Sequence, residues 1–215
     1  MTLFLTCDSS FKDAGKDIIS GKVAIFPTDT VFGLGTNPRS AQGVATCYKI
    51  KKRDMGKKMP LLVSGIRSAK ELALFGRRST SLASTFWPGK LSIVLPVKDR
   101  SLPRELVGEN GTIALRVPNH DCCLRLIASC GGFLIGTSAN ISGEDPLTNP
   151  QDPRLVELSK SADIFVAGPC GESSGVSSTI VDATTDEDIR VVREGAIPRG
   201  EIFAYLEKIS KTDFS

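Results

Sequence analysis

Short apolar runs alternate along this chain with longer stretches whose apolar residues recur at helical spacing, and this alternation predicts an α/β fold. Gly or Pro stands at or near the ends of several of these apolar runs, which is typical of strands. The predicted strands cover residues 23–26, 60–63, 91–97, 112–117, 133–135, 163–166, 179–181 and 189–192. The predicted helices cover residues 10–20, a segment that begins at Ser40, and residues 68–75, 79–86, 121–130 and 197–208. Little helix separates the last three strands, so we expect a mixed parallel and antiparallel sheet.

The length of 215 residues, with 40% hydrophobic and 24% charged residues, is ordinary for a single globular domain. We expect one domain over residues 1–215, with a core from about 10 to 207 and a flexible C-terminal tail from 210 to 215. The first residues lack the basic start of a signal peptide, and no apolar run approaches membrane-spanning length. The sequence therefore predicts a cytoplasmic protein with no membrane partner.

The six cysteines are not expected to form disulfides or to bind zinc. They include no Cys-x-x-Cys pair, and His120 is the only histidine. Cys122, Cys123 and Cys130 are interpreted as small apolar residues on a helix in a reducing compartment. A catalytic Cys–His pair that uses His120 is the less favoured alternative, because His120 directly precedes Asp121 at a helix start and resembles a capping neighbour.

Residues 27–35 and 49–58 predict a site for a small anionic ligand. The first segment follows an apolar strand and combines the hydroxyls of Thr28 and Thr30 with Gly33 and Gly35, which allow close approach of the backbone. The second segment holds six Lys or Arg residues against one Asp, although the net charge of the whole chain is only +3. A solvated helix end is the alternative interpretation of this basic run.

Further polar groups occur where the other predicted strands end, which is where α/β sheets place their ligands. They are Arg116, residues 137–143, residues 177–179, and Arg193 beside Gly195. Brought together, these segments would form a pocket lined by hydroxyl groups and walled by cations.

These motifs resemble those of the YrdC/TsaC family of threonylcarbamoyl-AMP synthases. The matching segments, in order, are residues 27–34, Lys51-x-Arg53, residues 87–89, 116–118, 138–143 and 178–182, and Arg193-x-Gly195. Seven ordered motifs over about residues 10 to 200 are far more specific than a single glycine motif. The resemblance is to the short, single-domain form, and it implies a twisted mixed sheet flanked by helices around a concave basic cavity.

The resemblance also implies an activity, that of a nucleotidyltransferase. L-threonine, bicarbonate and ATP would give L-threonylcarbamoyladenylate and pyrophosphate, for the t6A modification of tRNA at adenosine 37. Mg²⁺ would arrive with ATP and keep most of its waters, so no dedicated metal ligands and no permanently bound cofactor are expected. The implied partners are the substrates, tRNA bound weakly, and downstream proteins that transfer the threonylcarbamoyl group.

The residue roles implied by the resemblance divide the site in three. Lys51 and Arg53 would be catalytic. The threonine-binding residues would be Thr30, Arg116, Thr137 and Ser178, and the ATP-binding residues would be Arg53, Lys57, Thr112, Ser138, Asn140 and Arg193. Attack on the α-phosphorus by a carbamate oxygen needs no protein nucleophile, because positioning and charge neutralisation supply most of the acceleration.

Departures from the family pattern leave some assignments open. Phe32 stands where many members have Tyr, and the usual register around Lys57 and Lys58 is blurred, so either lysine could face the nucleotide. A His that some members place at the end of the strand 60–63 is missing.

Two other functions fit parts of the sequence. A concave basic surface also suits a module that binds double-stranded RNA or tRNA without catalysis. Against this, aromatic residues make up only 6% of the chain and are not interleaved with the basic run. A YciO-like protein with altered catalysis is the third hypothesis, which the intact Lys51-x-Arg53 and Ser138-Ala139-Asn140 motifs disfavour.

Overall fold

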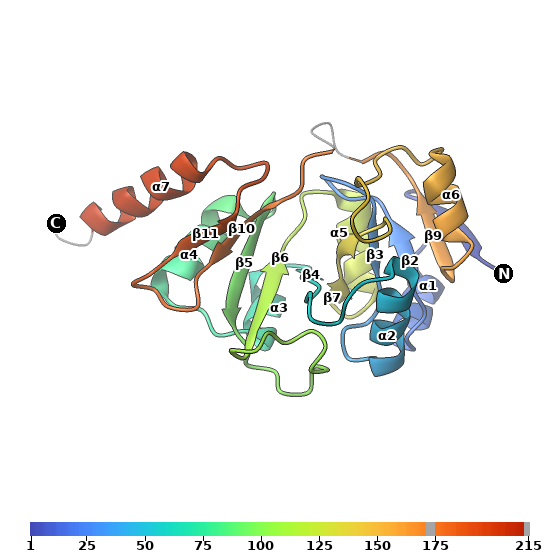
Figure 1. Cartoon of the computed structure of the whole chain (residues 1–215), viewed down its shortest axis with the longest axis horizontal. Coiled ribbons are helices and arrows are strands. Elements are labelled where there is room, and N and C mark those ends of the chain that lie inside the picture. The colour runs from blue at the N-terminus through green and yellow to red at the C-terminus, as the bar shows by residue number, and fades with distance from the viewer. Residues whose placement is uncertain (171–174, 213–215) are drawn as a thin grey trace.

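The computed structural model describes residues 1–170 and 175–212, and it places their strands in two mixed sheets. The first sheet has the order β1 (Leu3–Thr6), β9 (Ile164–Ala167), β2 (Ala24–Phe26), β3 (Gly33–Gly35) and β8 (Thr137–Ser138). The second has the order β11 (Arg190–Arg193), β10 (Thr179–Asp182), β5 (Leu91–Pro96), β6 (Thr112–Arg116), β4 (Leu61–Val63) and β7 (Phe133–Ile135). Figure 1 shows the first sheet toward the N-terminus and the outer strands of the second toward the C-terminus.

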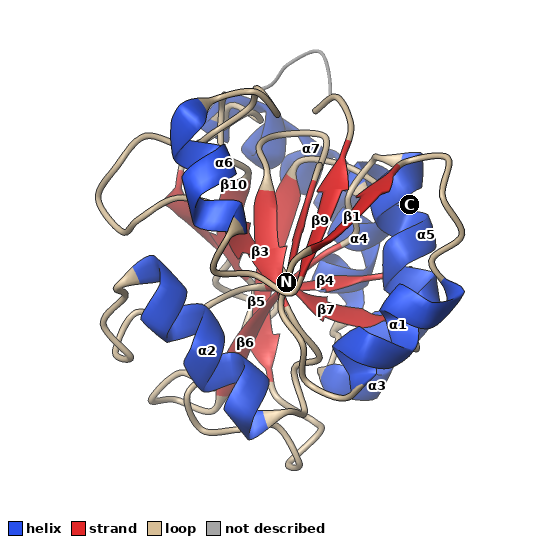
Figure 2. Ribbon diagram, turned by 90° about the vertical axis from the view of Figure 1, so that its right-hand side faces the viewer, coloured by secondary structure: helices blue, strands red, loops and turns tan. Residues whose placement is uncertain are grey.

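Helices surround these strands, as Figure 2 shows. They are α1 (Lys12–Ile19), α2 (Ala41–Lys51), α3 (Ile66–Leu72), α4 (Arg77–Phe86), α5 (Asp121–Ser129), α6 (Pro153–Ser159) and α7 (Arg199–Thr212). The predicted α/β class with mixed pairing is confirmed, because both sheets contain parallel and antiparallel pairs. The predicted single sheet is divided into two.

Four elements were not predicted from the sequence: β1, β3, β8 and α6. β3 reads Gly-Leu-Gly and β8 has two residues, so neither shows the apolar run that marks a strand. β1 is an edge strand and is largely exposed, so it lacks a buried face. α6 does carry start signals, since Asp152 caps it by accepting a hydrogen bond from the Arg154 amide and Pro153 is its first residue.

The last helix also differs from the prediction. α7 continues to Thr212, so the predicted flexible tail begins within a helix, and its residues 213–215 lie outside the described part of the chain.

The two sheets meet where β3 passes β7. The Ile135 amide donates to the Thr36 carbonyl at 2.9 Å. A Cβ atom on Gly35 would lie 1.7 Å from the Ile135 carbonyl oxygen, so only glycine allows this approach. The contact fixes the end of β3 against the second sheet.

A second, smaller core lies under α1 and α5. Both helices bury apolar faces, including Ile18 and Leu126, against Phe26 and Val166 of the first sheet. Cys123 and Cys130 are buried free thiols in or beside α5, as predicted. Burial raises the pKa of the Cys130 thiol to about 11, so it stays protonated near neutral pH.

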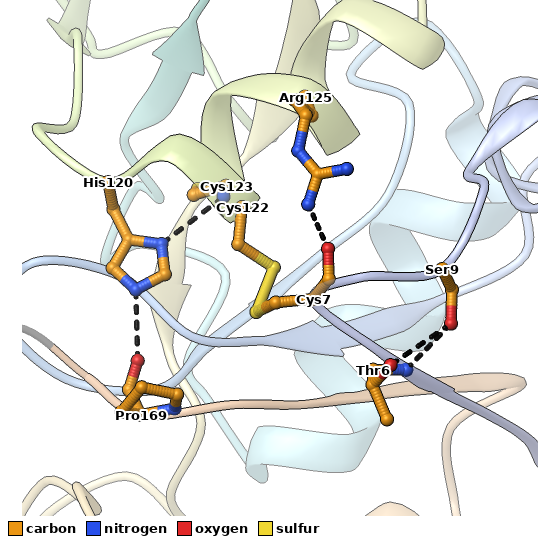
Figure 3. Close-up of a disulfide and its surroundings, with 8 residues drawn as sticks. All are labelled: Thr6, Cys7, Ser9, His120, Cys122, Cys123, Arg125 and Pro169. Carbon is orange, nitrogen blue, oxygen red and sulfur yellow. Dashed lines mark hydrogen bonds between the residues drawn. A yellow bond between two sulfur atoms is a disulfide. The ribbon is translucent and has the colours of Figure 1, made fainter.

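The expectation that the cysteines form no disulfide is wrong for Cys7 and Cys122. These residues are bonded to each other although they lie 115 positions apart, and Figure 3 shows the bond joining the end of β1 to the first turn of α5. The unpredicted pairing of β1 with β9 brings the two Cα atoms to 5.2 Å, within the range that a disulfide spans. The Arg125 guanidinium donates to the Cys7 carbonyl beside it.

His120 caps α5, which agrees with its interpretation as a capping neighbour. Its Nδ1 accepts a hydrogen bond from the Cys123 amide at 3.3 Å, and its Nε2 lies 2.9 Å from the Pro169 carbonyl oxygen. Separately, no helix within residues 1–170 and 175–212 combines the length and the apolar character needed to cross a membrane.

The disulfide predicts a measurable loss of stability on reduction. Because it closes a loop of 115 residues, Cys7→Ser should lower the free energy of unfolding by about 2–5 kcal/mol, mainly through the unfolded chain. Urea unfolding of the oxidised protein, with and without a reductant, measures this. The reductant should shift the midpoint of the natural chain and leave that of Cys7→Ser unchanged; an unshifted midpoint in both proteins contradicts the bond.

Candidate functional site

A cavity of about 400 Å³ is lined by residues of both sheets and of the loops at their ends. Four cationic side chains line it, those of Arg53, Lys58, Arg116 and Arg193. Its other polar wall residues are mainly hydroxyl-bearing, and the lining within the described residues includes no Asp or Glu. The cavity therefore presents net positive charge together with short hydrogen-bonding groups, which suits anionic ligands.

Thr28 and Thr30 form one wall through a tight turn between β2 and β3. The Thr28 Oγ1 accepts from the amides of Thr30 at 3.1 Å and Val31 at 3.2 Å, and it donates to the Val31 carbonyl at 2.6 Å. It also lies 3.0 Å from the Thr30 Oγ1. Both threonines are buried, so the turn holds its two hydroxyls in fixed positions.

The guanidinium of Arg116, at the end of β6, contacts three residues in two separate segments. Its Nε donates to the Gly89 carbonyl at 2.8 Å, and one terminal nitrogen donates to the Thr30 Oγ1 at 3.1 Å. The other terminal nitrogen donates to Asp29 Oδ1 at 2.5 Å. Both members of this ion pair are buried, with side chains 7% and 5% exposed. The turn at Trp87-Pro88-Gly89, one of the matching motifs, thus supplies an acceptor that orients Arg116.

The two carboxylate oxygens of Asp29 lie in different surroundings. Its Oδ2 is buried and has no hydrogen-bond partner among the described residues, while Oδ1 is held by Arg116. Asp29 does not line the cavity. It therefore acts on the site through Arg116, as the one buried acid beside that cation.

Ser178 and Arg193 complete the opposite wall. The Ser178 Oγ lies 2.9 Å from the Oγ of buried Ser92 on β5, and the Ser178 carbonyl accepts from the Arg193 guanidinium at 2.8 Å. Burial lowers the pKa of Arg193, and the positive charges of Arg116 and Arg53 lower it further. Arg116 and Arg53 are thus close enough to Arg193 for their charges to affect its ionisation. A Cβ on Gly195 would lie 2.3 Å from the Ser177 carbonyl oxygen, so the backbone approaches closely at this glycine.

Arg53 and Lys58 reach the cavity from the loop that follows α2. The Nε of Arg53 donates to the Lys57 carbonyl at 2.7 Å, and a terminal nitrogen donates to the Lys58 carbonyl at 3.1 Å. Burial lowers the pKa of Arg53. The structure places Lys58 on the cavity wall, whereas Lys57, the predicted nucleotide contact, is exposed and does not line it. The blurred register in the sequence allowed either lysine.

Lys51 is buried against the loop that carries Ser138 and Asn140. Its Nζ donates to the carbonyls of Ser138 and Asn140, the latter at 2.8 Å, and lies 3.2 Å from Asn140 Oδ1. The residue is 1% exposed and does not line the cavity, and neither does Asn140. Burial, with a smaller effect of the Arg53 charge, lowers the pKa of Lys51 to about 8.

Most of the predicted site residues meet in this cavity. Those on its wall are Thr30, Arg53, Thr112, Arg116, Thr137, Ser138, Ser178 and Arg193. Lys51, Lys57 and Asn140 are the three that do not line it. Ser92 was not predicted as a site residue, because a lone hydroxyl on an apolar strand is uninformative without the register of β5 with β10.

Comparison with known proteins finds related sequences that match most of the chain. A family model for Sua5, YciO and YrdC, described as telomere recombination, matches residues 16–195. The threonylcarbamoyl-AMP synthase of Coxiella burnetii is 32% identical over 183 residues, which cover 85% of this chain and 97% of that protein. The threonylcarbamoyl-AMP synthase of Bacillus subtilis is 29% identical over 205 residues, which cover 95% of this chain but 58% of that protein. This chain thus spans little more than half the length of some relatives that it matches.

Solved structures with the same fold include Sua5 of Pyrococcus abyssi complexed with L-threonine. It matches with a TM-score of 0.86 at 28% identity, covering 96% of this chain and 61% of that one. YciO of Escherichia coli matches with a TM-score of 0.81 at 21% identity, covering 94% of this chain and 98% of that one, and supports the fold alone.

The buried pair of Asp29 and Arg116 predicts a large effect on stability. Asp29→Ala should lower the free energy of unfolding by about 3–5 kcal/mol, because it leaves a buried guanidinium without its counter-charge. Denaturant unfolding measures the change. Asp13→Ala, which removes the exposed partner of Lys16, is the matched control and should have no measurable effect. Equal, small effects of both substitutions would contradict the importance of the buried pair.

Proposed function

The chain belongs to the Sua5/YciO/YrdC family, and from this premise we propose that it is an L-threonylcarbamoyladenylate synthase. The reaction joins L-threonine, bicarbonate and ATP and releases pyrophosphate. Its product would serve the t6A modification of tRNA. The proposal draws on the names of the relatives and on the threonine bound to P. abyssi Sua5.

The single observation that supports this proposal best is the charge of the cavity. Arg53, Lys58, Arg116 and Arg193 line it without an acidic residue in the described lining. The three reactants carry a triphosphate, a carboxylate and a developing carbamate, all of them negative. Such groups repel one another in water, and a cavity with fixed cations offsets that repulsion while holding them in contact.

Threonine would bind at the end formed by Thr30, Arg116, Thr137 and Ser178. Arg116 engages three of its five N–H groups with described residues, which leaves two to pair with the threonine carboxylate. The fixed hydroxyl of Thr30 is suited to orient the amino acid. Burial of this end would strengthen each of these hydrogen bonds.

The nucleotide would bind at the other end, along Arg53, Lys58, Thr112, Ser138 and Arg193. The guanidinium groups of Arg53 and Arg193 are already oriented by backbone carbonyls, so little reorganisation is needed when phosphate arrives. Mg²⁺ would enter with ATP: the described residues contain no group of three or more His, Cys, Asp or Glu that could hold a metal ion. The triphosphate and water would therefore supply its ligands.

The chemistry would proceed without a protein nucleophile. The threonine amine forms an N–C bond to the carbon of bicarbonate as a C–O bond of bicarbonate breaks, and water leaves with that oxygen and the proton from the amine. An oxygen of the resulting carbamate then attacks the α-phosphorus. The bond between the α-phosphorus and the bridging oxygen breaks, and pyrophosphate leaves with that electron pair. The charge that accumulates around the phosphorus faces Arg53 and Arg193, which would lower the barrier electrostatically.

The product is a mixed anhydride, which water readily hydrolyses. It would therefore pass to proteins that transfer the threonylcarbamoyl group to tRNA, and weak binding of tRNA by this chain itself is part of the proposal. We infer a cytoplasmic site of action because its substrates and tRNA acceptor are found there.

The proposal predicts that Arg53→Ala lowers the rate of threonine- and bicarbonate-dependent pyrophosphate release by about 10² to 10³-fold or more, because one transition-state cation is lost. Mass analysis of the reaction mixture should detect the mixed anhydride with the natural chain and not with the variant. Lys49→Ala removes an exposed cation from the same basic run and is the control that should keep full activity. Circular dichroism should show an unchanged fold for both variants.

Two results would contradict the proposal. Pyrophosphate release that does not depend on threonine and bicarbonate would indicate a different reaction. An affinity for RNA that falls steeply with salt, in a protein that turns over no ATP, would favour the RNA-binding module instead.

A further inference from the structure

Lys51, the last residue of α2, is bonded to one loop by both its side chain and its backbone. Its Nζ donates to the Ser138 and Asn140 carbonyls and lies within 3.2 Å of Asn140 Oδ1. Its own carbonyl accepts from the Ser142 amide at 2.9 Å. The segment 138–142 is thus attached to the end of α2 at both of its ends.

The other face of this loop belongs to the cavity. Ser138 lines it, whereas Asn140 faces away, toward Lys51, and its Nδ2 donates to the Glu144 carbonyl at 2.6 Å. The backbone of the loop is held from a second side, where the Ala139 amide donates to the Phe32 carbonyl at 2.7 Å. A change at Lys51 would therefore move Ser138, on the cavity side.

Lys51 and Arg53 have different surroundings although they belong to one motif. Lys52 between them ends α2 in the left-handed conformation, with φ of 47°, and reverses the chain direction. After this reversal Arg53 reaches the cavity wall, while Lys51 remains 1% exposed behind it. The two basic residues of this motif thus have different roles: Arg53 lines the cavity, and Lys51 holds the loop.

We propose that Lys51 is a positioning residue, which fixes the loop 138–140 for the nucleotide and does not touch the reacting groups. This inference rests on the proposed function for its kinetic consequences, but its structural consequences can be measured without any activity. It replaces the catalytic contact that the sequence predicted for Lys51.

The protonation state of Lys51 links this role to pH. The protonated amine has three N–H donors for three acceptors, and the neutral amine has two. Its pKa of about 8, below the ordinary 10.5, means that the third donor is lost as pH rises through 8. The titratable groups that act on it are Arg53, which lowers its pKa, and Cys47, whose buried thiol has a pKa of about 12; the loop presents only carbonyl and amide groups.

Loss of the Lys51 proton as pH rises should weaken the hydrogen bonds to the loop, but it should not lower the global stability of the fold. Because the folded chain holds this proton less tightly than the unfolded chain, the contribution of Lys51 to the free energy of unfolding rises between pH 8 and 10.5. A loss of activity over that range would therefore report the loop and not unfolding caused by Lys51.

Lys51→Met, which keeps the side-chain length and removes the donors, tests the proposal. Hydrogen exchange of a peptide covering residues 137–144 should show at least tenfold lower protection. The kcat/KM for ATP should fall by about 10 to 10²-fold, mostly through KM, because Ser138 is displaced. The KM for L-threonine should change less, because Lys51 donates directly to the Ser138 carbonyl, whereas no described hydrogen bond joins it to Thr137.

Lys49→Met, on the same helix but exposed, is the matched control and should alter neither protection nor kinetics. A fall in kcat with unchanged KM for ATP and unchanged protection would overturn the proposal, because it would place Lys51 at the reacting atoms. If the natural chain releases no pyrophosphate, the proposed function fails, while the exchange measurement still decides the role of Lys51.

Asn140→Asp gives a second test that does not require Lys51→Met to fold. In the natural chain the kcat/KM for ATP should decline above about pH 8. A carboxylate in place of the Asn140 amide, 3.2 Å from Nζ, should hold the proton more tightly and move this decline to higher pH. A decline at the same pH in both proteins, or no decline in the natural chain, would contradict the link between Lys51 and the loop.

Discussion

Arg116 lies where both sheets contribute to the cavity, and its guanidinium ties three chain segments to one point. It holds the turn before β3 through Thr30 and Asp29, and it holds the turn before β5 through the Gly89 carbonyl. β6, which carries Arg116, pairs with β5 and β4, so the guanidinium is also fixed to the second sheet. The Asp29 carboxylate offsets the electrostatic cost of burying this cation.

The remaining cations are held mainly by carbonyl groups. Arg53, Arg193 and Lys51 donate to backbone oxygens, and each has a lowered pKa with burial as the first cause. Carbonyls orient a cation without neutralising it, so the positive charge stays available to a ligand. An anionic ligand would then relieve the electrostatic cost of burying these groups, and binding and ordering of the site would be coupled.

The sequence predicted most of the site because its motifs lie at strand ends, where an α/β fold brings distant segments together. Thr30, Arg116, Ser178 and Arg193 were found in this way. The direction in which a side chain points is a different matter: Lys51 and Arg53 are two positions apart, and only the left-handed turn at Lys52 separates them. Ser92 needed the register of β5 with β10, and the choice between Lys57 and Lys58 needed the path of the loop.

The elements of the fold were likewise predictable where the signal is local and not where it depends on strand pairing. Strands with continuous apolar runs, such as β5 and β6, were predictable, while Gly33–Gly35 became a strand only through pairing with β2 and β8. The disulfide depended on β1, an edge strand without a buried face, so the pairing of Cys7 with Cys122 had no sequence signal.

A crystal structure of the protein with a non-hydrolysable ATP analogue and L-threonine would show whether the cavity holds both ligands. The phosphates should lie between Arg53, Lys58 and Arg193, and the threonine carboxylate should lie on Arg116, with Asp29 still paired to that guanidinium. Ligands bound outside this cavity, or an Arg116 that leaves Asp29 and contacts neither ligand, would contradict this placement.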